Sequence, residues 1–195
     1  PFGVGANQVI AARGSDGDFD LQLSSRRMNI AWPGVRVAAT IEVNGERIDS
    51  YGARLMGIAL SNLVEHGPGR GISNTEIAGI EGMESPVDYI PGDGSGITHA
   101  LRSAGVITAR TGYGSGPRVE GTESSAWPSD TDPRCQYHVQ LIFDLMRDEI
   151  LLYLDQYKDL PATPERISYF EKVINDKLEQ RSIGENRWFY GGRFS

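Results

Sequence analysis

Several stretches of the sequence carry residue types that could do chemistry, and a Gly-rich turn is the first of them. Gly92-Asp-Gly-Ser-Gly96 precedes a predicted short helix, and the N–H groups of such a turn at a helix N-terminus can bind phosphate or another anion. The turn lacks the Lys-Ser/Thr ending of a phosphate loop and the spacing of the dinucleotide fingerprint. We favour a plain turn, with a small α/β enzyme that binds a phosphorylated ligand there as the alternative.

Carboxylates and hydroxyls elsewhere do not match the patterns that calcium binding or hydrolysis needs. Asp16, Asp18 and Asp20 alternate as hard-cation ligands sometimes do, but the central Gly and the distal bidentate Glu of a calcium loop are absent at the required offsets. Ser95 and Ser115 lie in Gly-rich segments, and neither stands in the Gly-x-Ser-x-Gly elbow that exposes a nucleophile. We assign no catalytic residue and predict that the protein is not an enzyme.

The cysteine and the histidines are the remaining candidates for metal ligands. Cys135 and His138 lie three residues apart, a spacing that can place both on one face of a helix. His66 and His99 belong to separate predicted elements, so a closed zinc site with four ligands would need an improbable coincidence. Packing is the favoured role for these residues, and we predict neither a metal nor a cofactor.

Length and charge limit the possible partners. The chain has 195 residues, enough for one domain with a single core, and its net charge is −7. Direct binding of nucleic acid, which requires cations to neutralise phosphates, is not expected. No apolar run approaches the roughly 20 residues that a membrane-spanning helix needs, so we expect no membrane insertion. One cysteine excludes an intramolecular disulfide and is consistent with assembly in the cytosol.

The elements that would position these residues alternate between strands and helices. A helix is predicted from Ser50 or Asp49 to His66, followed by a Gly-Pro stop, and a short helix follows the Gly92 turn. Predicted strands or extended pieces cover Asn7–Arg13, Arg26–Trp32, Ala39–Val43 before Asn44-Gly45, Glu76–Ile80, Pro86–Ile90 and Val106–Ala109. This alternation predicts an α/β fold, with α+β possible, in which helices flank a mixed β-sheet.

The second half of the chain contains the longest predicted elements. An apolar stripe at helical period runs from Cys135 to Leu160, and Pro161 ends it. A second helix begins at Thr163 as N-cap with Pro164 at its first position, and the two helices should pack side by side. The chain closes on an aromatic strand, Arg187–Ser195, that has no closing turn. We divide the sequence into an N-terminal arm (1–26), a core domain (27–186) and an apparently truncated C-terminal strand (187–195).

Four short motifs occur in an order that resembles one known family. They are Arg27-Met-Asn-Ile-Ala-Trp-Pro33, Gly67-Pro-Gly-Arg-Gly-Ile-Ser-Asn74, Ala104-Gly-Val-Ile-Thr-Ala-Arg110 and Ala126-Trp-Pro-Ser-Asp-Thr-Asp-Pro133. Each motif is degenerate, so the weight lies in their order and spacing over residues 27 to 192. The chain resembles the C-terminal core of contractile phage tail sheath proteins, although members of that family usually extend further at both ends.

The resemblance implies a mechanical function. Sheath subunits stack as hexameric rings around a tail tube, between a baseplate and a tail terminator, and switch from an extended to a contracted lattice that drives the tube through the host envelope. It implies a homo-oligomer in the virion, assembled in the host cytoplasm. Another phage tail scaffold protein is a further alternative, and the resemblance leaves open whether the device is a phage or a phage-derived injection system.

Two sets of residues are predicted to make contacts between subunits or with the tube. Terminal segments with unpaired strand edges can add to a neighbour's sheet, and we expect this of Val9, Ile10, Trp188, Phe189 and Tyr190. Arg166 and Lys177 lie about three helical turns apart and therefore on nearly one line of the last helix. We expect this pair to face an acidic tube, while solvent-facing charges are the plain alternative.

Overall fold

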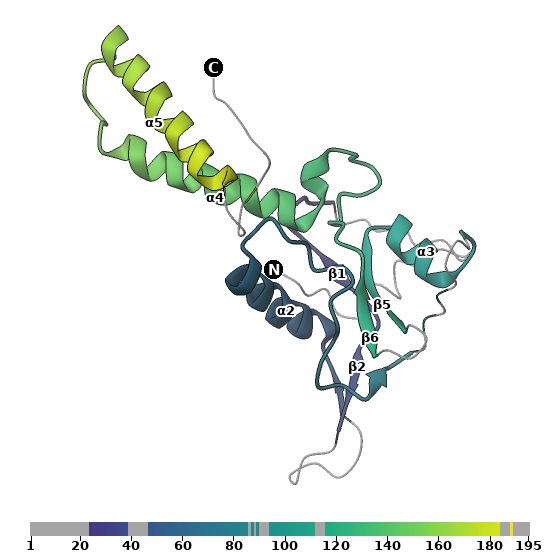
Figure 1. Ribbon diagram of the computed structural model, residues 1–195. Coiled ribbons are helices and arrows are strands. Elements are labelled where there is room, and N and C mark those ends of the chain that lie inside the picture. Colours follow the sequence, from purple (N-terminus) through teal and green to yellow (C-terminus); the bar gives the residue numbers. More distant parts are fainter. Residues whose placement is uncertain are drawn as a thin grey trace.

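The computed structural model describes residues 24–38, 47–85, 87, 89, 94–111, 116–183 and 188. Two three-stranded sheets form the centre of this part of the chain (Figure 1). In the first sheet, β1 (Ile30–Ala31) lies parallel to β5 (Val106–Thr111), and β6 (Pro117–Glu120) pairs antiparallel with β5. In the second, β2 (Val35–Val37) pairs antiparallel with β3 (Arg47–Asp49) and β4 (Gly82–Met83). The predicted α/β class with a mixed sheet is confirmed.

Strand β5 is the central strand of the first sheet. Its sequence, Val-Ile-Thr-Ala-Arg-Thr, is rich in β-branched residues, and its first four residues are buried on both faces. Ile30 aligns with Val106 and Ala31 with Ile107. The strand that the sequence predicts over Val106–Ala109 is confirmed and continues to Thr111.

Helices cover the sheets on both sides of β5. Helix α2 (Tyr51–His66) buries Leu55 and Ala59 in the main core cluster together with Ile107, and the short helix α3 (Ile97–Ser103) buries Leu101 beside Val106. Gly67 follows α2 with φ of 76° and ψ of 178°, a positive-φ conformation that glycine adopts more readily than other residues, so it ends the helix without forming a left-handed helical cap. Both helices lie where the sequence predicts them.

Several details of the fold were predicted wrongly or missed. Glu76–Ile80 is not a strand: Glu76 makes one isolated bridge to Arg118, and Gly79 then turns the chain at φ of 71°. The predicted helix from Cys135 to Leu160 is shorter, because Gln136 is extended and separates a 3₁₀ turn, η1 (Pro133–Cys135), from α4 (Tyr137–Asp155). The strand predicted over Arg26–Trp32 is limited to β1, because residues 26 and 27 form a turn. Strands β2, β3, β4 and β6 were not predicted, since each is short and β6 follows a Gly-rich segment.

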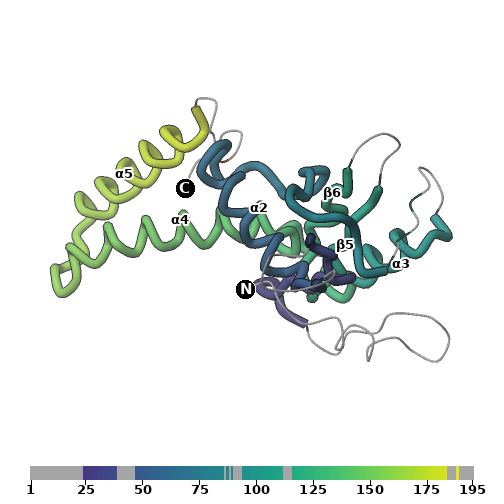
Figure 2. The backbone as a smooth tube through the Cα atoms, turned by 90° about the horizontal axis from the view of Figure 1, so that it is seen from below, coloured from purple at the N-terminus to yellow at the C-terminus, as the bar shows by residue number. Residues whose placement is uncertain are grey.

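The second half of the chain forms a helical hairpin, α4 and α5 (Pro164–Ser182). Thr163 caps α5, since its side chain accepts a hydrogen bond from the Arg166 N–H, and Pro164 occupies the first turn as predicted. The closed end of the hairpin points away from the sheets in both views (Figures 1 and 2). None of the helices in the described part of the chain has the length and apolar character needed to cross a membrane.

The terminal strand predictions fall mostly outside the described residues. This holds for Asn7–Arg13, with Val9 and Ile10, and for Phe189 and Tyr190. It also holds for all of Ala39–Val43, for most of Pro86–Ile90 and for the Asn44-Gly45 turn. The strands β2 and β3 on either side of that turn pair as a hairpin would.

Candidate interaction surfaces

Two of the sequence motifs that carry the family resemblance meet in the folded chain. Gly105, at the start of β5, has φ of +74°, and a Cβ there would lie 2.7 Å from the Ser124 carbonyl oxygen and 2.8 Å from that of Trp127. Only glycine combines this conformation with so close an approach of the backbone. The Ala-Gly-Val-Ile motif and the Ala-Trp-Pro motif therefore form one packed corner ahead of α4.

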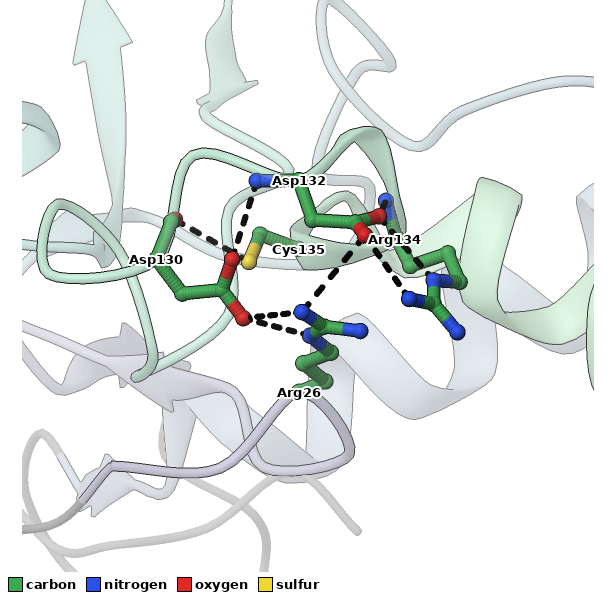
Figure 3. A network of polar contacts seen from close by, with 5 residues as sticks. All are labelled: Arg26, Asp130, Asp132, Arg134 and Cys135. Atoms are coloured by element: carbon green, nitrogen blue, oxygen red, sulfur yellow. Dashed lines mark hydrogen bonds and ion pairs between the residues drawn. The ribbon is translucent and has the colours of Figure 1, made fainter.

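A network of charged side chains holds this corner to the first described segment of the chain (Figure 3). The Arg26 guanidinium pairs with Asp130 and lies 3.5 Å from the Asp132 carboxylate. Asp132 accepts hydrogen bonds of 2.8 Å and 3.0 Å from the backbone N–H and the Nε of Arg134. The network thus fixes where the chain enters α4.

The carboxylates of this network are stabilised in their charged form. The side chain and backbone N–H groups of Arg134 hold the pKa of Asp132 well below its ordinary value. The backbone N–H of Asp132 and the Arg26 guanidinium lower the pKa of Asp130. Both groups are ionised at neutral pH and engaged in hydrogen bonds, which suits a structural corner better than acid–base chemistry.

The carboxylates buried at the other end of the corner are also paired. Glu123 accepts a hydrogen bond of 3.1 Å from Arg102 on α3, and Glu120 lies 3.3 Å from Arg102 and 3.0 Å from Arg110. Each buried charge therefore faces a guanidinium, as burial requires. These contacts join α3 to β5 and β6, and both carboxylates are paired with guanidinium groups.

The residues with possible chemistry lie apart from one another or in packed positions. Cys135 is buried, its thiol donates to the Asp130 carbonyl at 3.1 Å, and burial raises its pKa. Burial lowers the pKa of His138, which packs beside Gly71. Among the described residues, no group of three or more His, Cys, Asp or Glu side chains could hold a metal ion. Of the Gly92–Gly96 turn, residues 94–96 are described, and they lead into α3.

The seam of the hairpin combines an ion cluster with an aromatic cluster. Glu149 of α4 pairs with Lys177 at 3.3 Å and with Arg181 at 2.9 Å. Nearer the closed end, the Phe170 ring meets Tyr153 and Tyr157 edge-on, with centroids 6.1 Å and 5.0 Å apart. Contacts of this kind hold two helices together without a surrounding core.

The structure places the predicted contact residues of the C-terminal part as follows. Arg166 donates to the Pro161 carbonyl at 2.6 Å, so it closes the loop before α5, and Lys177 lies in the ion cluster with Glu149. The Trp188 N–H donates to the Arg181 carbonyl at 2.8 Å, and the Arg181 guanidinium lies 4.5 Å from the centre of the Trp188 ring. All three residues therefore have partners within the chain.

The hairpin also has a surface property that the sequence reading missed. Most of the 19 residues of α4 are apolar, yet none of them is buried, and α5 buries only Ile174. A helix that is apolar around most of its circumference is normally buried. The sequence indicates this exposed apolar surface at Ile150-Leu-Leu-Tyr-Leu154, where apolar residues lie on every face of the helix and are not limited to one stripe.

These features define a class of protein: an α/β core with a projecting helical hairpin and extensive unpartnered apolar surface, as in a subunit of a larger assembly. The chain is 27% identical over 194 residues to the tail sheath protein of Burkholderia phage BcepMu, an alignment that covers 97% of the chain and 40% of the relative. The chain thus spans about two fifths of the curated relative that it matches. No protein-family model matches the chain.

Solved structures with the same fold come from contractile injection systems. The anti-feeding prophage helical sheath in its contracted state aligns with a TM-score of 0.69 at 18% identity, over 86% of this chain and 44% of that chain. The contracted PVC sheath complex aligns with a TM-score of 0.68 at 13% identity, over 92% of this chain and 46% of the PVC chain. A chain of the contracted anti-feeding prophage baseplate aligns with a TM-score of 0.71 at 14% identity, over 96% of this chain and 46% of the baseplate chain. The resemblance to contractile tail sheath proteins is confirmed, and the fold is that of the contractile sheath.

Proposed function

We propose that this chain is the core of a contractile sheath subunit, which stacks as hexameric rings around a tail tube and contracts to drive the tube through an envelope. The observation that carries the proposal is the agreement between two comparisons: 97% of the chain aligns with a phage tail sheath protein, and its fold aligns with contracted sheaths. The role is structural, and no relative favours the alternative of a small enzyme with a phosphate-binding Gly92 turn.

The direct test is electron microscopy of the purified natural polypeptide in negative stain. Striated hollow sleeves are the expected result, because a heterologous contact that does not close builds a helix. Isolated globules at all salt and protein concentrations would contradict the proposal. The alternative enzyme predicts instead a thermal shift with nucleotides or sugar phosphates, since a ligand at 100 times its Kd adds about 2.7 kcal/mol.

We propose that the terminal segments join neighbouring subunits by adding a strand to the neighbour's sheet. The arm (1–26), with Val9 and Ile10, and the C-terminal strand (187–195), with Trp188, Phe189 and Tyr190, are the segments that we assign to this role. Strand β1 supports it, because no described strand pairs with its outer edge while Ile30 and Ala31 are buried. Further proposed partners are the baseplate and tail terminator proteins, in a particle that is a virion or phage-derived and assembles in the host cytoplasm.

We also propose that Arg166 and Lys177 face the tail tube. Their spacing on α5 places them on one side of the helix, and both carry positive charge that an acidic tube would attract. Reversing both charges, Arg166→Glu with Lys177→Glu, should abolish co-sedimentation with the tube. Reversing Lys172 alone is the control, since Lys172 lies on the same helix about a third of a turn away from the line through Arg166 and Lys177. Unchanged co-sedimentation of the first variant would exclude the assignment.

A further inference from the structure

Trp188 makes two different contacts with one residue of its own hairpin. Its backbone N–H donates to the Arg181 carbonyl oxygen at 2.8 Å. The centre of its indole ring lies 4.5 Å from Cζ of the Arg181 guanidinium, and the residue is partly buried. Trp188 is therefore held to α5 through its backbone and through its side chain.

The backbone contact completes the end of α5. The last four carbonyl groups of a helix have no partner within the helix. In α5, which ends at Ser182, the Glu179 carbonyl accepts from the Ser182 hydroxyl at 2.8 Å, and the Arg181 carbonyl accepts from the Trp188 N–H. The residue that follows the helix, Ile183, is already extended, with φ of −107° and ψ of 146°. Trp188 thus supplies a bond that the end of the helix needs.

The side-chain contact is prepared by the ion cluster of the hairpin. Nη2 of Arg181 donates to Glu149 Oε1 at 2.9 Å and Nε donates to Oε2 at 3.4 Å, so the carboxylate holds the guanidinium by one edge. A guanidinium held by its edge leaves its flat face to stack on an aromatic ring, and tryptophan is the ring that binds a cation best. Lys177 pairs with the same carboxylate at 3.3 Å.

These contacts limit what Trp188 can do in strand addition. An added strand is held by main-chain hydrogen bonds to the edge of its neighbour's sheet. The N–H of Trp188 already donates within its own subunit, so it does not donate to such a ladder. A segment with a fixed base also loses less conformational freedom on binding than a segment that is free along its whole length.

We infer that Trp188 anchors the C-terminal segment to its own hairpin through Arg181, and that a neighbouring subunit receives the residues after Trp188. The inference rests on the proposed strand addition and gives Trp188 a different part in it from Phe189 and Tyr190. Trp188 is the base of the strand, and the residues that follow it are the strand. Because Arg181 also pairs with Glu149 of α4, a force on the received strand would reach both helices of the hairpin.

Limited digestion of the free full-length polypeptide with trypsin tests the anchor. Cleavage after Arg187 requires that Trp188, the next residue, leaves α5. Arg181→Met removes the guanidinium and keeps a long side chain with high helix propensity. It should speed this cleavage about two- to fivefold, the range expected for loss of an exposed cation–π contact. Arg181→Lys keeps a cation beside Glu149 but loses the flat face, so it should give a smaller increase.

Two controls separate the anchor from a general weakening of the hairpin. Lys177→Met takes the other cation from Glu149 and leaves the ring contact, so cleavage after Arg187 should keep its rate. Cleavage after Lys172, inside α5, reports opening of the hairpin and should be equal in all variants. An unchanged rate after Arg187 in Arg181→Met would overturn the anchor, as would an equal acceleration after Lys172 or in Lys177→Met. If Arg181→Met does not fold, an unchanged rate in Arg181→Lys overturns it.

Sleeve formation tests the part of the anchor in assembly. Arg181→Met should raise the protein concentration at which sleeves appear by about two- to fivefold, since the same contact is lost in each subunit. Lys177→Met should leave that concentration unchanged. Faster cleavage with an unchanged sleeve concentration would overturn the assigned part in strand addition. If the unaltered polypeptide forms no sleeves, the proposed function fails, whereas the digestion still supports or overturns the anchor in the free subunit.

Discussion

The sheet core and the α4–α5 hairpin differ in what completes them. In the core, Ile30, Val35, Leu55, Ile107 and Val119 are all at most 1% exposed. In the hairpin, α4 buries no residue and α5 buries one. The core is therefore closed by its own side chains, whereas the hairpin is held by the contacts between its two helices and leaves apolar side chains exposed.

In the sheath subunit that we propose, this difference would combine a fixed fold with contacts between subunits that can change. Burial of about 25 cal/mol per Å² of apolar surface stabilises the core within each subunit. The exposed apolar surface of the hairpin does not gain this stabilisation within the described chain, and in the proposed lattice it would gain it where subunits meet. Contacts between rigid bodies can then rearrange while each core stays folded.

The largest effect is expected from truncating a core leucine. Leu55 on α2 is fully buried, so Leu55→Ala removes packed methyl groups and leaves a cavity, and it should lower the free energy of unfolding by about 2–5 kcal/mol. Leu152→Ala on the hairpin should change it by less than about 0.5 kcal/mol. Urea unfolding of both variants makes the comparison, and equal effects would remove the distinction between the two regions.

The next test is at Gly105, which lies in the corner that joins the sheet core to the α4–α5 hairpin. Gly105→Ala places a Cβ against two carbonyl oxygens at a left-handed φ, and it should cost about 2–4 kcal/mol in the free energy of unfolding. Gly57→Ala is the matched control, because it lies in open space within a helix and should stabilise the free subunit by about 0.5–1 kcal/mol. Thermal unfolding of both variants measures the difference, and a neutral Gly105→Ala would contradict the described corner.

Helix caps give a smaller effect with a built-in control. Thr163 accepts a hydrogen bond from the Arg166 N–H, whereas Ser50 makes no side-chain cap bond at the start of α2. Thr163→Ala should therefore destabilise the hairpin by about 1 kcal/mol, and Ser50→Ala should have a smaller effect. Far-UV circular dichroism during urea unfolding checks the order of the two, and the reverse order would contradict the assigned caps.

The pH dependence of the Arg26 network is the smallest expected effect. The pKa of Asp132 is depressed, so its contribution to stability is present above the unfolded value of about 3.8 and is lost as the pH falls below it. Asp132→Asn should lower the melting temperature at pH 7, and its difference from the unaltered chain should shrink below about pH 4. A difference that stays constant from pH 7 to pH 3 would exclude the ionised network as its source.

Local signals in the sequence predicted much of the fold. Thr163 and Pro164 marked the start of α5, Gly67 marked the end of α2, and the β-branched run after Gly105 marked β5. These elements depend on caps and propensities that each segment carries itself.

Other elements depend on contacts that no local pattern contains. Helix α4 starts at Tyr137 and not at Cys135, since the N–H groups of Ser124 and Tyr137 bond to carbonyls of Cys135 and Thr122 across the corner. Strand β6 forms because β5 and the segment at Asn74–Ile77 accept it as a partner. The candidate surfaces were also missed, because a periodic apolar stripe predicts a helix without showing which faces stay uncovered.

Hydrogen exchange of the free subunit and of the assembled sleeve tests the central claim most directly. The account predicts that amides of β5 and α3 exchange slowly in both states, while amides of α4 and α5 exchange quickly in the free subunit and at least tenfold more slowly in the sleeve. Hairpin amides that exchange equally fast in both states would contradict the claim that assembly completes this half of the molecule.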